Sequence, residues 1–353
     1  MKKNLPDSHT ERLRTDGLSP SGIEHSDGQW YAQNFTKASS IEERLHNFFD
    51  FARERHAIFL RRSRGYPKPW TLDPILQKHR FCNVYRELDT VSIWIRDNII
   101  KPYEDHPDLW FMLCMARVIN WPDSLQELMD VRGGFPSKGE FSPKIAFDGL
   151  MDRRRRGLKT ITGAYIINSV TSDKDPAEIR GNKLAYIAYR TLGEIWKDRQ
   201  SIRDSFKRTL QESVQTLKKY QGYGPFIAYQ VTVDLTYSNK WLGKASDYNT
   251  FNSAGPGTCR GLSLVFHGQK FVRMSDEEKT KLLTFQLRAS RNPNYWPHTH
   301  KDMRKGFAPL SMSNVSNCNC EFSKHTAVAL GIGRMRSSYP GIPSSAEAQQ
   351  SLF

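Results

Sequence analysis

Apolar residues recur every three to four positions through most of this 353-residue chain, and this spacing constrains the fold more than any other feature. In IEERLHNFFDFARERHAIFLRR, which begins at Ile41, the apolar residues follow the period of an α-helix and Arg and Glu fill the opposite face. Ser39 or Ser40 can cap this helix, and Gly65 with the prolines after it ends it. Sustained two-residue alternation is scarce, so a mainly α fold is predicted.

The same periodicity predicts further helices. The segment 108–121 is apolar nearly all round, which predicts a helix buried in the core. TITGAYIINS (160–169) is compatible with a short strand or a helix, and its pattern does not decide between them. The other predicted helices cover residues 80–100, 122–131, 142–152, 181–198 and 203–220.

Both ends of the chain lack periodicity. Residues 1–40 are rich in Ser, Asp, Thr and Gly and predict a disordered arm, and residues 333–353 predict a flexible tail, which leaves one domain over 41–332. No apolar run approaches the ~18 to 20 residues needed to cross a bilayer. Two lysines without an apolar block do not make a secretory signal. The five cysteines, an odd number, fit reduced thiols. We therefore expect a cytoplasmic protein (host cytoplasm if viral) with no membrane partner.

The charge balance points to a polyanionic partner. Lys and Arg number 52 against 37 Asp and Glu, for a net charge of +15, which favours nucleic acid first. Two basic runs stand out, FLRRSRGYPKPW (59–70) and DRRRRG (152–157). Either run can be a solvated face, and we predict phosphate contacts. The predicted contact residues are Arg61, Arg62, Lys68, Arg153, Arg154, Arg155 and Arg156.

LKKYQGYGPFIAYQVTVDL, residues 217–235, places two glycines and a proline between two helical stretches. Gly222 and Gly224 let the backbone take positive φ and approach a ligand closely. Pro225 suits the first position of the second helix, whose free N–H groups and positive dipole end can hold a phosphate. The alternative is an ordinary glycine-capped helix pair. We favour a helix–hairpin–helix that binds a DNA backbone, over residues 203–236.

This stretch resembles the helix–hairpin–helix DNA glycosylase superfamily. In that superfamily a segment after the hairpin carries a catalytic Asp, and KASDYNTF, which begins at Lys244, is similar to it. The resemblance places Asp247 as the acid and Lys244 beside the DNA. Phe226 stands where bifunctional members carry a lysine, which argues against Schiff-base lyase chemistry. The four-cysteine iron–sulfur pattern of some members is absent.

Several further stretches resemble one branch of that superfamily, the helical proteins of DNA-thymine hypermodification in phages. These are alpha-glutamyl/putrescinyl-thymine pyrophosphorylases, or amino acid:DNA transferases, and the helical domain of 5-hydroxymethyluracil DNA kinases. The resemblance covers about residues 41–326. The stretches that carry it are GYPKPWTLDPILQKHRFCNVYRELD (65–89), FIAYQVTVDLTYS (226–238), SAGPGTCRGL (253–262) and CNCEFSKH (318–325).

The resemblance implies transfer of an amino acid or other amine onto phosphorylated or pyrophosphorylated 5-hydroxymethyluracil in double-stranded DNA, with displacement of the phosphate. In a phage this would protect the genome from host restriction. One alternative is an N-glycosylase that excises a bulky modified base. Another is a non-catalytic DNA-binding partner of a 5-hydroxymethyluracil DNA kinase, which is also a possible pathway partner of the transferase. No metal or nucleotide cofactor is expected.

AGPGTCRGL lacks the Gly-Lys-Ser/Thr ending of a P-loop, which argues against a self-sufficient nucleotide kinase. Gly255, Gly257 and Arg260 can still bind a phosphate through N–H groups and a guanidinium fork. A structural Gly-Pro-Gly turn is the alternative, and the sequence does not decide between them.

Three acids are candidate catalytic residues. Asp247 is either a reacting group or a helix cap. Asp234, inside an apolar run, is either a second catalytic acid or a core carboxylate paired with an Arg or with backbone N–H groups. Glu321 can orient a substrate amine or an Arg, or be structural. Trp70, Tyr85 and Tyr229 are core candidates, one of which can stack on an extruded base.

A zinc site was weighed for the cysteines and histidines near the end of the chain. Cys-x-Cys is tighter than the usual two-to-four residue spacer of structural zinc sites, so no metal site is predicted. The residues concerned are Cys318, Cys320, His298, His300 and His325.

Overall fold

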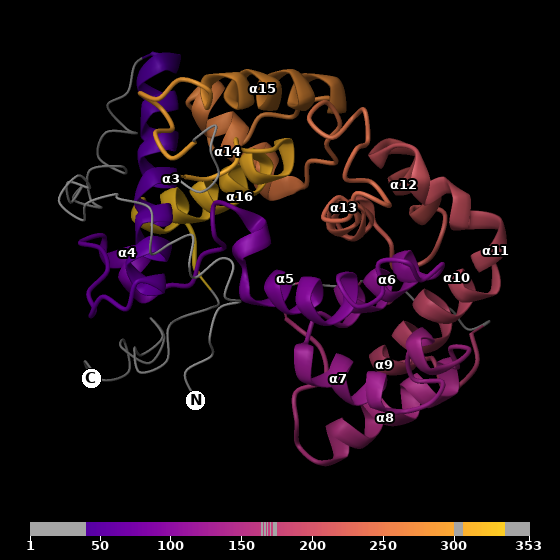
Figure 1. Ribbon diagram of the computed structural model, residues 1–353. Helices are drawn as coiled ribbons and strands as arrows, with labels where there is room; N and C mark the ends of the chain where they lie inside the picture. The colour runs from indigo at the N-terminus through magenta and orange to yellow at the C-terminus, as the bar shows by residue number, and fades with distance from the viewer. Residues whose placement is uncertain are drawn as a thin grey trace, which may run out of the picture. The chain divides into compact units, whose positions relative to one another are not determined.

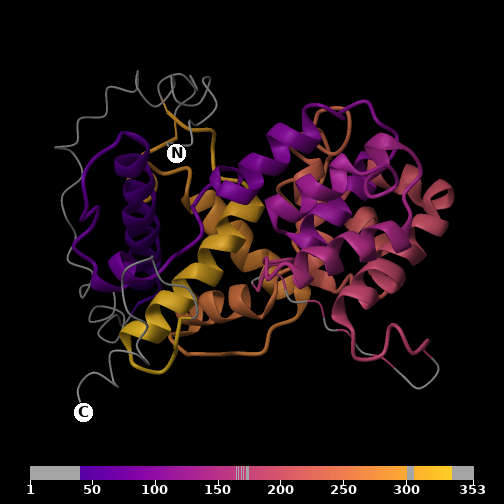
Figure 2. The same ribbon diagram turned by 90° about the horizontal axis from the view of Figure 1, so that it is seen from below.

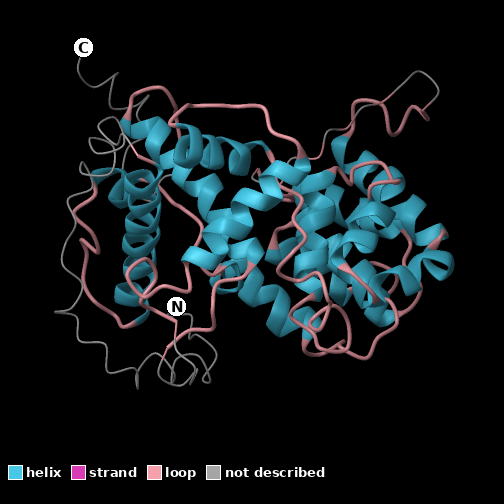
Figure 3. Cartoon of the chain, turned by 90° about the horizontal axis from the view of Figure 1, so that it is seen from above, coloured by secondary structure: helices cyan, strands magenta, loops and turns pink. Residues whose placement is uncertain are grey.

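The computed structural model describes residues 40–163, 165, 167, 169, 171, 175–299 and 306–335, and this part of the chain contains helices and loops but no strand (Figures 1 and 3). The predicted arm (1–40) and tail (333–353) lie almost wholly outside the described residues, and so does His300. The chain divides into two compact units, between which the sequence analysis drew no boundary. Unit 1 comprises Met1–Arg86 and Ala254–Phe353, and unit 2 comprises Glu87–Ser253.

The first helix of unit 1 begins where the sequence predicts. The Ser40 hydroxyl accepts a hydrogen bond from the Glu43 N–H, and the Glu43 carboxylate accepts one from the Ser40 N–H. This capping box satisfies two amides that the first turn leaves without partners. The helices of unit 1 are α3 (Ile41–Ser63), α4 (Pro74–Lys78), α14 (Pro256–Leu262), the π-helical turn η7 (Ser263–His267), α15 (Asp276–Ala289) and α16 (Met312–Ala329).

The core of unit 1 joins helices from the two ends of its sequence. Phe48 and Phe51 of α3 both contact Phe322 of α16 with ring centroids 5.7 Å apart, and all three rings are buried. α14 and α15 also pack on α16, which runs through the unit (Figure 2, yellow). The 3₁₀ turn η2 (Arg86–Leu88) leads into unit 2.

Unit 2 is built around α6 (Leu109–Ile119), in which every residue is buried. This confirms the predicted core helix, and α7 and α13 pack directly on it. The other elements are α5 (Thr90–Ile95), η3 (Arg96–Ile100), α7 (Pro122–Asp130), η4 (Pro136–Lys138), α8 (Pro143–Arg155), α9 (Lys183–Ala185), η5 (Tyr186–Leu192), α10 (Gly193–Lys197), α11 (Arg199–Ile202), η6 (Arg203–Lys207), α12 (Leu210–Leu217) and α13 (Pro225–Leu235).

The predicted helix over 80–100 is wrong in its first half, because α5 begins only at Thr90. Arg55 of α3 donates to the Phe81 carbonyl and to Asn83 Oδ1, both at 2.8 Å, and so holds this segment as a loop. The predicted helix over 203–220 is divided into η6 and α12. The described residues of 160–169 form neither helix nor strand. In the described part of the chain no helix has the length and apolarity to span a bilayer.

Candidate functional site

The Gly-x-Gly-Pro turn joins α12 and α13, which pack against each other (Figure 1). Gly222 has φ +87°, and a Cβ atom there would lie 2.4 Å from Thr191 Oγ1, so the fold itself requires this glycine. Gly224 is different. Its φ is −64°, and a Cβ atom there would meet nothing within 4 Å. Gly224 precedes Pro225 at the start of α13, and the open space beside it leaves room for a ligand.

The N-terminus of α13 is exposed at this turn. Pro225 has no N–H, and the N–H groups of Phe226 and Ile227 find no acceptor in the described part of the chain. The Phe226 side chain is 43% exposed and contacts the Tyr165 ring at 5.2 Å. The turn therefore presents free amide donors, the positive end of a helix dipole and an aromatic face together.

Asp247 lies at the start of the other helix of this hairpin. Its two carboxylate oxygens accept hydrogen bonds from the N–H groups of Leu210 and Gln211, each at 2.9 Å. Thr209 caps the same helix through its hydroxyl, which accepts from the Glu212 N–H at 3.1 Å. The half-buried Asp247 is thus a helix cap, and each oxygen retains a lone-pair site for another donor. Lys244, three residues earlier, is exposed.

An open groove of about 510 Å³ lies beside this cap. Residues of η6 and α12 line it, including Gln211, whose N–H binds Asp247. Arg208 and Lys219 contribute cationic side chains, and Asp204 and Glu212 contribute carboxylates. Asp247 is not itself a lining residue, and its connection to the groove is the hydrogen bond from the Gln211 N–H.

Asp234 is fully buried in α13 and is bound by Arg117 of α6. Arg117 Nε and Nη2 donate to the two carboxylate oxygens at 2.5 and 2.7 Å, and Nη2 also donates to Ser92 Oγ at 2.9 Å. This confirms the expectation that a carboxylate in this apolar run is paired, here with an Arg. The pair connects two core helices, and the structure places Asp234 in the core of unit 2, away from the exposed turn.

In unit 1 the stretches SAGPGTCRGL and CNCEFSKH pack against each other. A Cβ atom on Gly257 of α14 would lie 2.3 Å from Cys320 Sγ of α16, and one on Gly261 would lie 2.3 Å from the Asn319 carbonyl oxygen. Thr258 Oγ1 also donates to the Ser316 carbonyl at 3.0 Å. Close packing of the two helices thus explains why residue 257 is a glycine. Gly255 has a different position, at the N-cap of α14 before Pro256.

Glu321 of α16 is buried and binds two groups, the backbone of the loop that contains Cys82 and the side chain of Lys324. Glu321 Oε2 accepts from the Cys82 N–H at 3.2 Å, and Oε1 binds Lys324 Nζ at 2.6 Å. Arg260 of α14 is exposed and has no ion-pair or hydrogen-bond partner within the described residues. Lys324 lies in the stretch CNCEFSKH but was not among the predicted site residues. Its spacing of three residues from Glu321 on one helix was the available signal.

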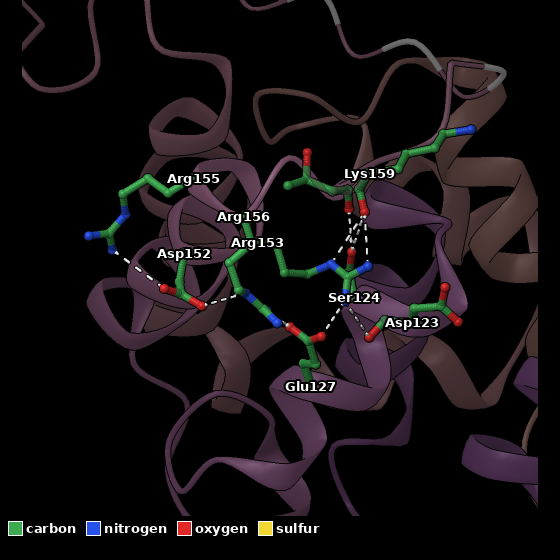
Figure 4. A network of polar contacts seen from close by, with 9 residues as sticks. Asp123, Ser124, Glu127, Asp152, Arg153, Arg155, Arg156 and Lys159 are labelled. Atoms are coloured by element: carbon green, nitrogen blue, oxygen red, sulfur yellow. Dashed lines mark hydrogen bonds and ion pairs between the residues drawn. The ribbon is translucent and has the colours of Figure 1, made fainter.

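The basic run of α8 is largely paired within unit 2 (Figure 4). Arg153 is 5% exposed, binds Glu127 and donates to the Lys159 carbonyl. Arg156 binds Glu127 at 2.6 Å and Asp152 at 2.9 Å, and Arg155 lies 3.9 Å from Asp152. Arg154 is exposed without a partner in the described structure. Of the four predicted contact residues, Arg154 is therefore the one that forms no ion pair within the described residues.

The other basic run surrounds Trp70. Arg61 forms an ion pair with Glu54 at 3.3 Å and donates to the Trp70 carbonyl. Arg62 and Lys68 lie over the Trp70 ring, 5.1 and 5.2 Å from its centroid. These are cation–π contacts, so Trp70 holds two of the predicted cations near the surface.

The candidate zinc ligands have separate surroundings. His325 Nε2 lies 2.6 Å from Asp73 Oδ2, and Cys318 Sγ faces the Val84 carbonyl at 4.0 Å. Cys320 faces Gly257. Within the described residues no three His, Cys, Asp or Glu side chains form a group that could hold a metal ion.

Two comparisons connect this chain with known proteins. The family model "5-hmdU DNA kinase, helical domain" matches residues 42–332. A 5-hmdU DNA kinase of Bacillus phage SP10 is 27% identical over 220 residues, which are 60% of this chain and 34% of the phage protein. The aligned region thus spans about a third of that relative's length. No solved structure matches the chain. Because the family model covers most of the sequence, this chain belongs to the family of the 5-hmdU DNA kinase helical domain.

Proposed function

We propose that this protein is a DNA base-modifying enzyme of thymine hypermodification. It transfers an amino acid, through its amine, onto phosphorylated or pyrophosphorylated 5-hydroxymethyluracil in double-stranded DNA. Family membership supports the substrate class. The observation that carries the proposal is the hairpin. It opens one helix with Gly224, which the packing of the fold does not require, and it has the Asp247 carboxylate at the start of the other helix.

The hairpin would bind the DNA backbone. A phosphate oxygen that approaches Gly224 meets the free N–H groups at the start of α13 and the positive end of its dipole. These contacts do not depend on base identity. The exposed Phe226 ring lies beside them, where it can contact a sugar or a displaced base. Flipping the modified nucleotide costs a few kcal/mol, which backbone contacts and fit to the base offset.

The transfer has a simple balance of bonds. The amine nitrogen forms a bond to the 5-methylene carbon, the bond from that carbon to the phosphate oxygen breaks, and its electron pair leaves with the phosphate. A base must first take a proton from the incoming ammonium, and cationic donors must stabilise the departing anion. We assign the first role to Asp247, whose oxygens retain lone-pair sites beside an open polar groove.

The phosphoryl group would come from another protein. This sequence has no P-loop, and the relative from Bacillus phage SP10 is named as a 5-hmdU DNA kinase. We therefore propose that a kinase of this type supplies the substrate and that the present protein consumes it. No metal or nucleotide is assigned to the transfer itself.

The product of the reaction tests this proposal. Duplex DNA with 5-phosphomethyluracil is incubated with the protein, mixed amino acids and EDTA, and the nucleosides are analysed by mass spectrometry. We expect intact DNA that contains an aminoacyl-thymine. Alkali-labile abasic sites would instead identify a glycosylase, and unchanged DNA with normal binding would favour a non-catalytic partner.

Asp247→Asn and Thr209→Ala separate catalysis from capping. Both variants weaken the start of α12, by about 1 kcal/mol for Thr209→Ala. Only Asp247→Asn removes the proposed base, so we expect turnover to fall at least about 100-fold in that variant and to stay near normal in Thr209→Ala. Equal turnover in the two variants would show that Asp247 acts only as a cap.

A further inference from the structure

Three segments of unit 1 meet around Cys320. The loop that carries Cys82 donates its N–H to Glu321, and Glu321 binds Lys324 one turn after Cys320 on α16. From α14, Gly257 lies against Cys320 Sγ. Glu321 is only 4% exposed, whereas the Lys324 side chain is 44% exposed. A buried carboxylate therefore holds an ammonium group at the surface.

Two cations lie one helical turn from the contact between Gly257 and Cys320, Arg260 on α14 and Lys324 on α16. Burial raises the pKa of Cys320 and Glu321 adds to the rise, whereas Lys324 and Arg260 act to lower it. Burial acts to lower the pKa of Lys324, but Glu321 and the nearby thiols raise it above its ordinary value. Lys324 is therefore a permanent cation at neutral pH, and neither a base nor an amine nucleophile.

The donors of these two cations are not exhausted. An ammonium group has three N–H donors and a guanidinium has five. Lys324 uses one on Glu321 and one on the Cys320 thiol, and the Arg260 side chain has no hydrogen-bond or ion-pair partner in the described structure. The thiol is neutral, and the carboxylate of the cluster, Glu321, is buried against Lys324. This arrangement suits a compact dianion, which two cations bind better than either binds alone.

We propose that Lys324, positioned by Glu321, and Arg260 bind a terminal phosphoryl group over Cys320 on the surface of unit 1. The ligand is a phosphate monoester or a pyrophosphate. This binding involves residues of unit 1 alone and does not depend on the proposed function. The proposal gives Lys324 the role that the sequence suggested for Gly257, which packing against α16 accounts for.

Calorimetric titration of the full chain with inorganic pyrophosphate tests this site. Arg260→Ala and Lys324→Ala should each weaken binding by about tenfold or more, and Lys324→Arg should retain most of it. Glu321→Gln should weaken binding less than Lys324→Ala, because the ammonium remains but is no longer held. Arg288→Ala is the matched control, since Arg288 is an exposed arginine on α15 of the same unit. Because Arg260 is also exposed, Arg260→Ala should leave unit 1 folded. This variant therefore tests the site even if Glu321→Gln unfolds the unit.

Normal pyrophosphate binding by Arg260→Ala and Lys324→Ala would overturn the proposal, and so would an equal loss in Arg288→Ala. A parallel titration with unmodified duplex DNA distinguishes a terminal phosphoryl group from the DNA backbone. We expect duplex affinity to change less than about twofold in both variants. Loss of duplex affinity without loss of pyrophosphate binding would assign the cluster to the backbone. Asp247→Asn should bind pyrophosphate normally, so failure of amino acid transfer is read separately from failure of this site.

Discussion

Gly222 and Gly224 lie two residues apart in one turn, and their surroundings differ in a way that mutation can separate. Gly222 adopts a left-handed backbone conformation against Thr191, whereas Gly224 has an ordinary φ and open space beside it. A side chain at position 222 should therefore lower the stability of the fold. A side chain at position 224 should affect only the binding of a ligand.

Gly224→Asp should leave stability unchanged or slightly higher, because Asp is a favourable residue at a helix N-cap. The new carboxylate would face the proposed DNA phosphate, so we expect duplex affinity to fall about tenfold or more. Gly224→Ser serves as the uncharged comparison. Fluorescence anisotropy with a labelled duplex measures the affinity, and wild-type binding by Gly224→Asp would remove the hairpin from the DNA interface.

Gly222→Ala should instead lower the free energy of unfolding by about 2 kcal/mol or more, from left-handed strain together with the clash at Thr191. Adding Thr191→Ala should recover the part of the lost free energy of unfolding that comes from the clash, but not the part that comes from the left-handed φ. Thermal denaturation of the single and double variants measures both. A fully stable Gly222→Ala protein would contradict the described turn.

At the scale of the element, α8 carries four consecutive arginines whose roles differ by position. Arg153 is buried and bound to Glu127, whereas Arg154 is exposed. Arg154→Ala should leave stability unchanged and reduce the slope of log affinity against log salt by about 1. Arg153→Ala should destabilise unit 2 because it removes the buried guanidinium that binds Glu127 and the carbonyls of Lys159 and Asp123. If Arg154→Ala leaves the slope of log affinity against log salt unchanged, the basic run is a solvated face that does not contact DNA phosphates.

The packing of α6 on α13 depends on the buried pair of Arg117 and Asp234. Asp234→Asn leaves an uncompensated guanidinium in the core, so we expect a loss of about 3–5 kcal/mol. Replacing both residues, as in Arg117→Met with Asp234→Leu, should cost much less than the single change. Chemical denaturation of unit 2 measures both. A mild effect of Asp234→Asn on stability with abolished turnover would instead favour the catalytic alternative.

Periodicity predicted the elements in which local and tertiary preferences agree. The start of α3 follows from Ser40 and Glu43, and the buried α6 follows from its unbroken apolar run. The segment 80–89 has helical spacing, but Arg55 binds its carbonyl groups, and a contact across more than twenty residues has no local signal. For the same reason an Arg or backbone N–H partner could be predicted for Asp234, but Arg117 could not be identified as that partner. The grouping of Arg260 with Lys324 also depends on helix packing that spacing does not report.

At the scale of the whole molecule, the two units should respond differently to acid. In unit 1, His56 is fully buried and contacts His298 with ring centroids 4.7 Å apart. Neither of its ring nitrogens has a hydrogen-bond partner among the described residues. Burial, then His298 and nearby arginines, lower the pKa of His56 well below its usual value. Burial and then Arg53 lower the pKa of His298 to about 4.

Because these pKa values are lower in the folded state, the unfolded state binds more protons below about pH 6.5, and stability falls as the pH falls. Between pH 7 and pH 5 His298 should cost unit 1 about 2 kcal/mol. His56 should act in the same direction, because its pKa is also lowered in the folded state. His298→Phe should remove its share of this dependence. Denaturant titrations at the two pH values measure the effect, and a pH-independent midpoint for unit 1 would contradict it.

Unit 1 is made from both ends of the described chain, and unit 2 is the continuous segment between them. On the ribosome, α3 therefore emerges long before α14 and α16, the helices that complete its core. Phe48, Phe49 and Phe51 stay without their final contacts until all of Glu87–Ser253 has been translated. Unit 2 can fold during that interval, so the hairpin forms before the cluster around Cys320. A nascent chain stalled after Ser253 would contain the folded hairpin but not the cluster around Cys320.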